Sequence, residues 1–358
     1  MLGSAPVVAI DELAQRFRDF SGVSTATRAP LYSHLAAATA DDPDLLALLH
    51  HAPETQQLPV LFFAAVHHLL LRGQGAELAA FYPNLTAVPA EGDPFPVFRS
   101  VVLAHAHELA AVIATHHTQT NEIGRCNQFL LAFGLLADEV GPLAHLDVGT
   151  SAGLNLLLPR YSYDFEPGGC LNGGSPVQLQ CSLRGDAPVP RVMPAVTRSV
   201  GVDLMPVDVT DDDAVRWLEA CVWPDQADRF ARLVAAIGLA RQAPPDIRRG
   251  DAVASLAPLV DELAEHGHPV VTNSWVLNYL PHAARLAYVA ELDRIGAERD
   301  LSWVIAEAPD QTPGLPVATT DPPESITVLS LVRWRGGVRT STRLGTTHPH
   351  GYWVKWEA

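Results

Sequence analysis

The pattern of hydrophobic positions changes near residue 140. From residue 8 to about 139, apolar residues recur at three- and four-residue spacing, with breaks at prolines and glycines such as Pro43 and Pro53. This spacing predicts helices over 8–20, 30–38, 43–51, 58–72, 94–117 and 122–139. We therefore expect residues 1–120 to form an all-helical N-terminal cap and residues 121–358 to form a second domain.

After residue 140, short apolar runs alternate with helical segments. The runs predict strands at 143–148, 200–204, 247–249, 270–273 and 301–306, and the helical segments fall at 154–158, 212–241, 252–265 and 281–298. Strands that alternate with helices predict parallel βαβ units with right-handed crossovers. The expected fold class is α/β, with a doubly wound, Rossmann-like sheet.

The last part of the chain has a different pattern. Segments 326–334, 338–344 and 352–356 read as strands joined by short turns, which predicts antiparallel C-terminal strands. Segment 161–197 is rich in glycine and proline, so we expect an inserted hairpin or loop there.

The charge composition of the chain argues against some classes of binding partner. The chain has 358 residues, with 24 Lys and Arg against 40 Asp and Glu, which gives a net charge of −16. An acidic chain opposes binding to phosphate backbones and anionic lipids, so we expect a small-molecule substrate and no nucleic acid or membrane partner. Apolar run 58–71 is shorter than the ~20 residues that a bilayer requires.

Nothing in the sequence predicts a metal site or an exported protein. The four cysteines are far apart and form no C-x-x-C pair: Cys126, Cys170, Cys181 and Cys221. The N-terminus has no basic stretch followed by an apolar one. We expect a reduced, cytoplasmic protein without a metal.

The most informative motif runs from Asp147 to Gly153, Asp-Val-Gly-Thr-Ser-Ala-Gly. An apolar strand ends in an acid, glycines and small residues then form a tight turn, and an apolar helix begins at Leu154. Glycine permits close backbone approach, and a helix N-terminus offers free N–H groups. Ligands in such sheets bind beyond the carboxyl ends of the strands, so the turn is a candidate binding site.

The turn resembles the first motif of class I S-adenosylmethionine-dependent methyltransferases, acid-x-Gly-x-Gly-x-Gly, with Ser151 in place of the central glycine. The resemblance spans 121–358 and implies S-adenosyl-L-methionine as cofactor, with Asp147 facing its ammonium end. A dinucleotide fingerprint fails at positions 151 and 154. A hydrolase elbow, G-x-S-x-G, would make Ser151 the nucleophile, with Asp203 or Asp251 and with His282 or His350, but helices precede the turn where that fold has strands. A turn without any ligand is the fourth interpretation.

Later acids fit the methyltransferase resemblance. It implies that Asp203, ending the second strand, holds the ribose hydroxyls and that Asp251, after the third strand, reaches the adenine. The implied cofactor-binding residues are Asp147, Gly149, Thr150, Ser151, Gly153, Asn155, Asp203, Leu204, Asp251, Ala252, Asn273 and Ser274. The separation 203 − 147 = 56 positions exceeds one βα unit of ~20–30 residues. Either 161–197 is an insertion, or Tyr161–Glu166 is the second strand and Asp164 or Glu166 binds the ribose.

The reacting centre is expected beside the fourth strand and the turn His348-Pro-His-Gly. Counting strand directions puts that turn on the cofactor side, where His350 would accept a proton. We expect His350, Tyr279 and Glu122 to be catalytic, and Asn121, Arg125, Trp275 and His348 to bind substrate. Each has a simpler alternative: helix capping by Asn121, core packing by an aromatic ring, and a turn with solvated histidines.

The whole chain also resembles an uncharacterised bacterial family, through segments 119–125, 151–156, 222–224 and 348–351. That resemblance implies one integrated architecture but no reaction. The expected function is methyl transfer from S-adenosylmethionine to oxygen or nitrogen of a small molecule. The alternatives are another reaction of that cofactor (cyclisation, or transfer of its aminocarboxypropyl arm), a serine hydrolase and a non-catalytic nucleotide-binding protein.

Overall fold

The structure is a computed structural model that describes residues 8–315 and 326–358. Its residues group into two compact units. The first contains the chain up to Thr120 together with 210–234, and the second contains 121–209 and 235–358. Residues 210–234, which the sequence pattern assigned to the second region, therefore belong with the first unit.

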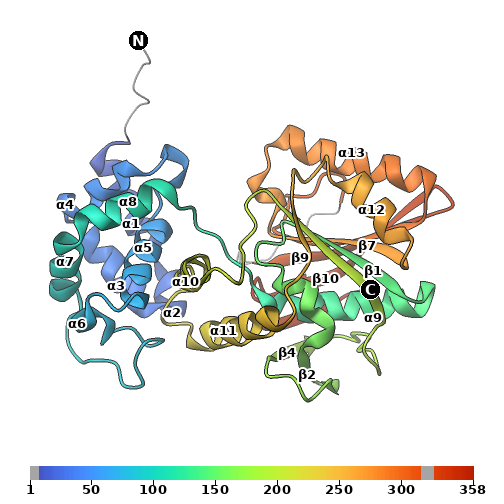
Figure 1. Cartoon of the computed structure of the whole chain (residues 1–358), viewed down its shortest axis with the longest axis horizontal. Helices are drawn as coiled ribbons and strands as arrows, with labels where there is room; N and C mark the ends of the chain where they lie inside the picture. The colour runs from blue at the N-terminus through green and yellow to red at the C-terminus, as the bar shows by residue number, and fades with distance from the viewer. Residues whose placement is uncertain (1–7, 316–325) are drawn as a thin grey trace, which may run out of the picture. The chain divides into compact units, whose positions relative to one another are not determined.

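The first unit is built from helices and contains no strand among its described residues (Figure 1). Its elements are α1 (Ile10–Phe20), α2 (Val23–Arg28), α3 (Pro30–Thr39), α4 (Pro43–Leu46), η1 (Ala47–His51), η2 (Glu54–Gln56), α5 (Pro59–Leu71), α6 (Ala76–Ala79), α7 (Phe95–Ala104), α8 (Ala106–Thr115), α10 (Asp212–Ala220) and the first half of α11 (Ala227–Gln242). The helical periodicity of the N-terminal region is confirmed.

One expected helix is divided in two. Segment 94–117 forms α7 and α8, which meet at His105 with a bend of 81°. The bend lets Phe98 and Val102 of α7, and Leu109 and Ile113 of α8, all bury their side chains in one core. No single helix of the described chain is long and apolar enough to span a bilayer, and the α7–α8 pair meets those two criteria only when its halves are combined.

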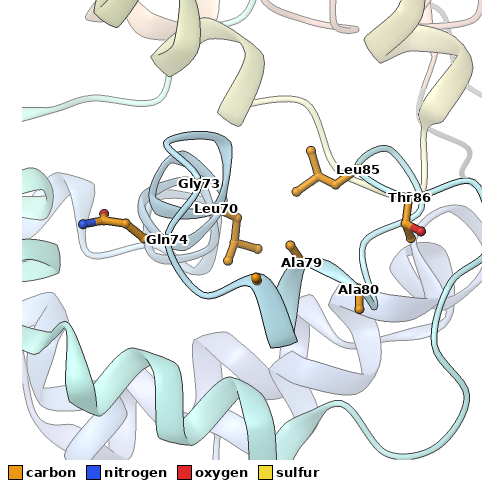
Figure 2. Close-up of a pocket in the computed structure, with 8 residues that line it drawn as sticks. Leu70, Gly73, Gln74, Ala79, Ala80, Leu85 and Thr86 are labelled. Carbon is orange, nitrogen blue, oxygen red and sulfur yellow. The ribbon is translucent and has the colours of Figure 1, made fainter.

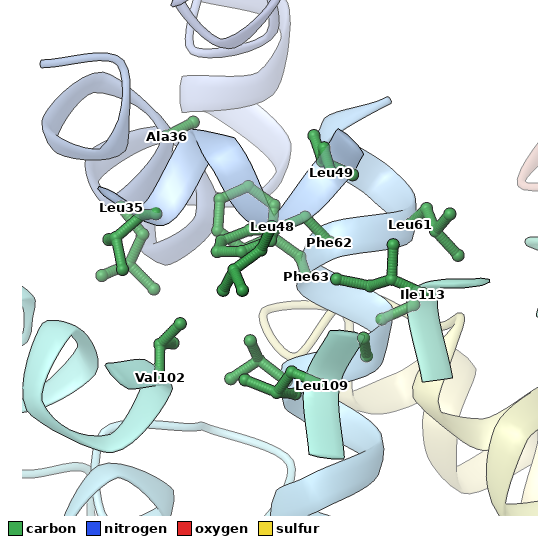
Figure 3. Close-up of a cluster of buried hydrophobic side chains, with 14 of the residues drawn as sticks. Leu35, Ala36, Leu48, Leu49, Leu61, Phe62, Phe63, Val102, Leu109 and Ile113 are labelled. Carbon is green, nitrogen blue, oxygen red and sulfur yellow. The ribbon is translucent and has the colours of Figure 1, made fainter. Parts of the chain in front are cut away.

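The core of the first unit is apolar and rich in aromatic rings. Phe63 of α5 is fully buried and stacks on Tyr32 of α3, with ring centroids 4.6 Å apart. Phe17, Phe62 and Phe98 surround it with centroid distances of 5.8, 5.6 and 6.0 Å. Figure 3 shows how α3, η1, α5, α7 and α8 contribute side chains to this cluster.

The second unit contains one eleven-stranded sheet. Its strands are β1 (Leu143–Val148), β2 (Ser162–Glu166), β3 (Gly169–Leu171), β4 (Gln178–Arg184), β5 (Val196–Asp203), β6 (Ile247–Arg249), β7 (His268–Ser274), β8 (Leu301–Glu307), β9 (Thr327–Arg335), β10 (Val338–Thr347) and β11 (Trp353–Trp356). Its helical elements are η3 (Ile123–Arg125), α9 (Cys126–Val140), η4 (Leu154–Arg160), the second half of α11, α12 (Leu256–Ala264), η5 (Leu277–Tyr279) and α13 (His282–Glu298).

The central strands lie in the order β6-β5-β1-β7-β8 and are mutually parallel. Numbered along the chain, these five strands read 3-2-1-4-5, which is the doubly wound order. The chain moves outward from β1 in one direction and then returns to continue from β7 in the other. The topological switch point therefore lies between β1 and β7, where ligands of open α/β sheets bind.

Both faces of β1 are covered, which explains why every residue of this strand is buried. Ala144, Leu146 and Val148 pack in one cluster with residues of α12 and α13. On the opposite face, the ring of His145 meets Phe133 of α9 edge-on, at a centroid distance of 5.0 Å. Alternation along the strand thus places helices on both sides of the sheet, as expected of a parallel α/β core.

The antiparallel C-terminal strands are confirmed. β9 pairs antiparallel with β8, β10 with β9 and β11 with β10. Because β10 again runs parallel to β8, the turn that follows it lies at the carboxyl edge of the central strands. This is the side on which strand counting placed the His348–Gly351 turn.

Segment 161–197 is neither a hairpin alone nor a loop. β2 and β3 do form a hairpin, but β4 pairs parallel with both β2 and β11, so the segment extends the same sheet at its far edge. The alternative in which Tyr161–Glu166 is the second strand of the core is therefore wrong. β5 occupies that place beside β1.

Candidate functional site

A buried carboxylate lies at the carboxyl end of the central strand. Asp147 is 3% exposed and accepts hydrogen bonds from the hydroxyls of Thr150 (2.8 Å) and Thr272 (2.7 Å). Burial raises its pKa to about 6, and the two hydroxyl donors oppose that rise. A carboxylate held away from water in this way is available to a cationic ligand group.

The same network continues beneath the site. Nε2 of His145 lies 2.7 Å from Oγ1 of Thr272. Because the single hydroxyl proton of Thr272 goes to Asp147, His145 must donate from Nε2. Burial lowers the pKa of His145 to about 3, so the imidazole is neutral and acts as a fixed donor.

The turn after β1 requires unusual backbone conformations. Gly149 has φ 72°, and a Cβ atom there would overlap the side chain of Val276. Ser151 has φ 57°, in the left-handed region that costs a residue with a Cβ about 1–2 kcal/mol. Position 151 therefore has the backbone geometry that glycine adopts most easily, although the residue there is serine.

Asp203 is brought directly to this turn. Its Oδ2 accepts the backbone N–H of Ser151 at 2.8 Å, and its Oδ1 accepts that of Met205 at 2.8 Å. Each oxygen can accept a further hydrogen bond. Asp164 and Glu166, the alternative ribose ligands, lie on β2 at the other end of the strand order.

Two buried hydroxyls at the switch point have no hydrogen-bond partner among the described residues. They are Oγ of Ser151, after β1, and Oγ of Ser274, at the end of β7. The side chains are only 3% and 9% exposed. Buried hydroxyls are normally paired, so two unpaired ones beside a strained turn fit a place where a polar ligand binds.

The expectation of free N–H groups in the turn is largely wrong. Gly149 and Thr150 both donate to the carbonyl of Val202, and Leu154 donates to Oδ1 of Asn121 at 2.9 Å. The following segment is a 3-10 helix, η4, with Pro159 inside it. The turn therefore presents mainly carboxylates and hydroxyls.

Segment 121–125 joins three parts of the carboxyl edge. Asn121 does not cap the helix that follows it, because its side chain accepts from Leu154 in the turn after β1. Arg125 donates to the carbonyl of Ser274 at 3.0 Å and to that of Pro349 at 3.0 Å. Its guanidinium also lies over the ring of Trp275, 5.9 Å from the centroid. Arg125 thus fixes the end of β7 against the turn after β10.

Glu122 and His350 face each other across this junction. Oε2 of Glu122 lies 3.3 Å from Nδ1 of His350, and the side chains are 4% and 19% exposed. Oε1 of Glu122 accepts the N–H of Gly124 at 3.0 Å. A Cβ on Gly124 would overlap the His350 carbonyl, and one on Gly351 would overlap the Gly124 carbonyl, so the two segments are in backbone contact.

The other expected site residues have structural contacts or lie apart. Asn155 accepts from Sγ of Cys126 at 3.4 Å, and the exposed Asp251 caps the N–H groups of Val253 and Ala254 at 2.9 Å. Half-buried Ala252 follows Asp251 in that bend. Leu204 and Tyr279 are 63% and 77% exposed, and neither has a described contact with the cluster of Asp147, Glu122 and His350.

His348 and Thr150 are held by local contacts. Nδ1 of His348 accepts the backbone N–H of His350 at 3.0 Å, and its ring lies 4.9 Å from that of Tyr352. Thr150 is fully buried, with its hydroxyl bound to Asp147 and its methyl group against Gly201. Gly153 has φ 70° and packs against Pro245 and Ile247.

Sequence reasoning did not single out Glu307, the last residue of β8. It is 1% exposed and accepts from Nδ2 of Asn273 at 2.6 Å and from the N–H of Val276 at 2.9 Å. Burial raises its pKa to about 7, against the lowering effect of these donors. The signal was an acid at or near the end of a mostly apolar strand, the same signal that marks Asp147.

Two pockets differ in chemical character. One, in the helical unit, has a volume of about 290 Å³ and a lining of small apolar side chains with Gln74 and Thr86 (Figure 2). It contains no titratable group. The other lies beside Glu307 and Ser330, and its volume of about 10 Å³ holds at most one water molecule. The titratable groups are concentrated at the carboxyl edge, not in the larger pocket.

No group of three or more His, Cys, Asp or Glu side chains in the described part of the chain is arranged to hold a metal ion. The four cysteines are free thiols. The groups at the carboxyl edge include carboxylates, hydroxyls, guanidinium groups and imidazoles.

Comparison with known families confirms one of the two resemblances. Residues 14–356 match the model of a family described as "Uncharacterized protein conserved in bacteria (DUF2332)". The chain belongs to this family. No curated protein matches the sequence. The match covers both units, so the helical region and the sheet are parts of one family architecture.

Proposed function

We propose that this protein binds S-adenosyl-L-methionine at the switch point of its sheet and transfers the methyl group to a small molecule. One observation carries the proposal. In the strand order 3-2-1-4-5, Asp203 at the end of β5 is hydrogen-bonded to the glycine turn after β1, which follows the buried Asp147. An adenosyl ligand with a cationic amino-acid arm needs such a pair of acids.

The side chains present fit the parts of that ligand. Asp203 keeps acceptor capacity for two ribose hydroxyls, and the buried Asp147 suits the ammonium group. The unpaired hydroxyls of Ser151 and Ser274 are additional polar contacts at the same edge. The cofactor would supply an electrophilic methyl carbon on a sulfonium, and the protein's contribution is alignment and exclusion of water.

The serine hydrolase alternative has less support. Ser151 has the left-handed backbone of a strained turn, but its hydroxyl has no described hydrogen bond to a histidine. The acid at Nδ1 of His350 is Glu122, and not Asp203 or Asp251, which the elbow interpretation required. The negative charges of Asp147 and Asp203 also oppose a nucleophilic serine, because they would disfavour an oxyanion nearby.

Isothermal titration with S-adenosylmethionine, S-adenosylhomocysteine and NAD tests the proposal. The first two are expected to bind and NAD is not. Asp203→Ala should weaken binding of both adenosyl ligands by about 1–3 kcal/mol, because charge-assisted hydrogen bonds are lost. Asp164→Ala removes an acid from β2 and serves as the matched control, with unchanged affinity. Equal affinity in wild type and Asp203→Ala would refute this assignment.

A further inference from the structure

Glu122 and His350 form an acid–imidazole pair in which one carboxylate oxygen of Glu122 caps η3 and the other faces the imidazole. Glu122 already caps Gly124 with Oε1, yet its second oxygen is directed at Nδ1 of His350. A carboxylate at Nδ1 holds an imidazole in the tautomer that leaves Nε2 basic, and it stabilises the imidazolium once a proton arrives. The two atoms are 3.3 Å apart, longer than a charge-assisted hydrogen bond, as catalytic hydrogen bonds often are before substrate binds.

The pair is held rigidly at the carboxyl edge. Arg125 and Asn127 donate to the carbonyls of Pro349 and Gly351, both at 3.0 Å, and Gly124 packs directly on Gly351. Arg125 also binds the carbonyl of Ser274 at the end of β7. These contacts fix the turn that carries His350 beside β7, one of the two strands at the switch point.

The charges around this place favour a cationic acceptor. The carboxyl groups of Asp147, Asp203 and Glu122 lie along the carboxyl edge with the guanidinium groups of Arg125 and Arg249. Anionic acceptors would meet an excess of negative charge there. An ammonium group would be attracted, but it has no lone pair for attack until a base removes its proton.

We propose that Glu122 and His350 form a proton-accepting dyad, with His350 as the base and Glu122 as its positioning residue, and that the methyl acceptor is an amine. This inference rests on the proposed function. Nε2 of His350 takes the proton from the acceptor's ammonium nitrogen. The nitrogen–carbon bond then forms as the carbon–sulfur bond breaks, and sulfur keeps the electron pair. The N-methylated amine and S-adenosylhomocysteine are the products.

A titration of the His350 ring by NMR tests the dyad without any turnover. Among the described residues, the charged and titratable groups that contact or lie near His350 include Glu122, Arg125, His348 and Tyr352. Glu122→Gln removes the negative charge and keeps the shape, so the midpoint for His350 should fall by about one pH unit or more. Glu357→Gln, a carboxylate paired with Arg343 and Lys355, is the matched control and should leave the midpoint unchanged. An equal midpoint in wild type and Glu122→Gln overturns the dyad.

A panel of matched acceptors tests the chemical class. Phenethylamine, phenethyl alcohol and phenylacetate differ only in the reacting group, and S-adenosylhomocysteine formation is followed by mass spectrometry. We expect turnover of the amine, with its rate reduced severalfold in Glu122→Gln at a pH above the His350 midpoints of both proteins, where the variant imidazole is the weaker base. Turnover of the alcohol or acid without the amine, or of none of the three, overturns the amine assignment. Failure of cofactor binding in calorimetry would instead refute the proposed function and leave the His350 titration as the separate measure of the dyad.

Discussion

The core of the helical unit and the carboxyl edge of the sheet are buried to a similar extent but differ in what they bury. In the helical unit, Phe63, Tyr32 and their neighbours pack ring against ring. Its buried His67 lies 3.1 Å from the Ala220 carbonyl and 3.0 Å from Nδ2 of Asn84, and burial lowers its pKa to about 4, so it is a neutral, fully paired group. The sheet edge instead buries carboxyl groups with raised pKa values beside a serine in the left-handed backbone region.

This difference separates the helical core, whose packing stabilises the fold, from the carboxyl edge, whose buried polar groups are suited to chemistry. Apolar packing stabilises wherever it is complete, whereas buried acids and strained residues cost free energy unless something else requires them. Asp147, near the end of β1, Glu307, at the end of β8, and Ser151, in the turn after β1, are such costs, and all three lie at the carboxyl edge of the central strands. This clustering is what makes the edge a functional-site candidate.

Phe63→Ala should give the largest effect and confine it to stability. Removing a fully buried aromatic ring leaves a cavity, so we expect a loss of about 3–5 kcal/mol in the free energy of unfolding. Urea denaturation followed by circular dichroism measures the loss. Calorimetry at low denaturant should show unchanged affinity for adenosyl ligands. A variant that folds normally but binds more weakly would break the division between the two regions.

Glu307→Gln should remove a pH dependence that comes from a buried carboxyl group of the sheet edge. The folded pKa of about 7 is above the ordinary value of 4.5, so the folded protein binds more protons than the unfolded chain between these values. Stability from this group is complete below about pH 4.5 and is lost as the pH rises through 7, by up to about 3 kcal/mol. Denaturation at pH 5 and pH 8 should show a smaller difference in Glu307→Gln than in wild type.

Exposed Glu265 supplies the control for this measurement. Glu265→Gln should leave the difference between pH 5 and pH 8 as it is in wild type. If Glu307→Gln also leaves the difference in stability between pH 5 and pH 8 unchanged, the carboxyl group of Glu307 does not hold its proton at neutral pH. The difference between the sheet edge and the helical core is then smaller than proposed.

Ser151→Gly should give the smallest effect, and it should raise the free energy of unfolding. Relief of the left-handed strain at φ 57° outweighs the extra freedom of glycine in the unfolded chain, so a gain of about 0.5–1 kcal/mol is expected. Ser182→Gly, in the regular strand β4, should instead lose about 0.5–1 kcal/mol. Thermal denaturation of both variants decides the sign, and a loss in Ser151→Gly would mean that the serine hydroxyl stabilises the turn.

Much of the fold follows from periodicity. Apolar runs located the central strands, and alternation with helices predicted their parallel pairing, because these patterns depend on local geometry. The extension by β2, β3 and β4 could not be predicted, since its pairing with β11 joins residues 353 − 182 = 171 positions apart. Long-range pairing of an edge strand leaves no local signal.

Only part of the candidate site could be predicted from the sequence, because some of its contacts also join distant segments. Asp147 and Asp203 stand at strand ends, and strand order brings them together. The contact of Glu122 with His350 depends instead on two glycines, Gly124 and Gly351, that let separate segments touch. Periodicity does not reveal such a meeting. Glu307 was missed because an acid at the end of a strand is also common where strands reach solvent.

The position of β11 between β10 and β4 has a consequence for how the molecule assembles. During synthesis, residues 162–184 leave the ribosome long before 353–356 exist, so the outer strands have no place on the main sheet. β4 therefore gains its β11 partner only after the intervening strands have been made. The pairing of β11 with both β10 and β4 is what joins the two groups of strands into one sheet.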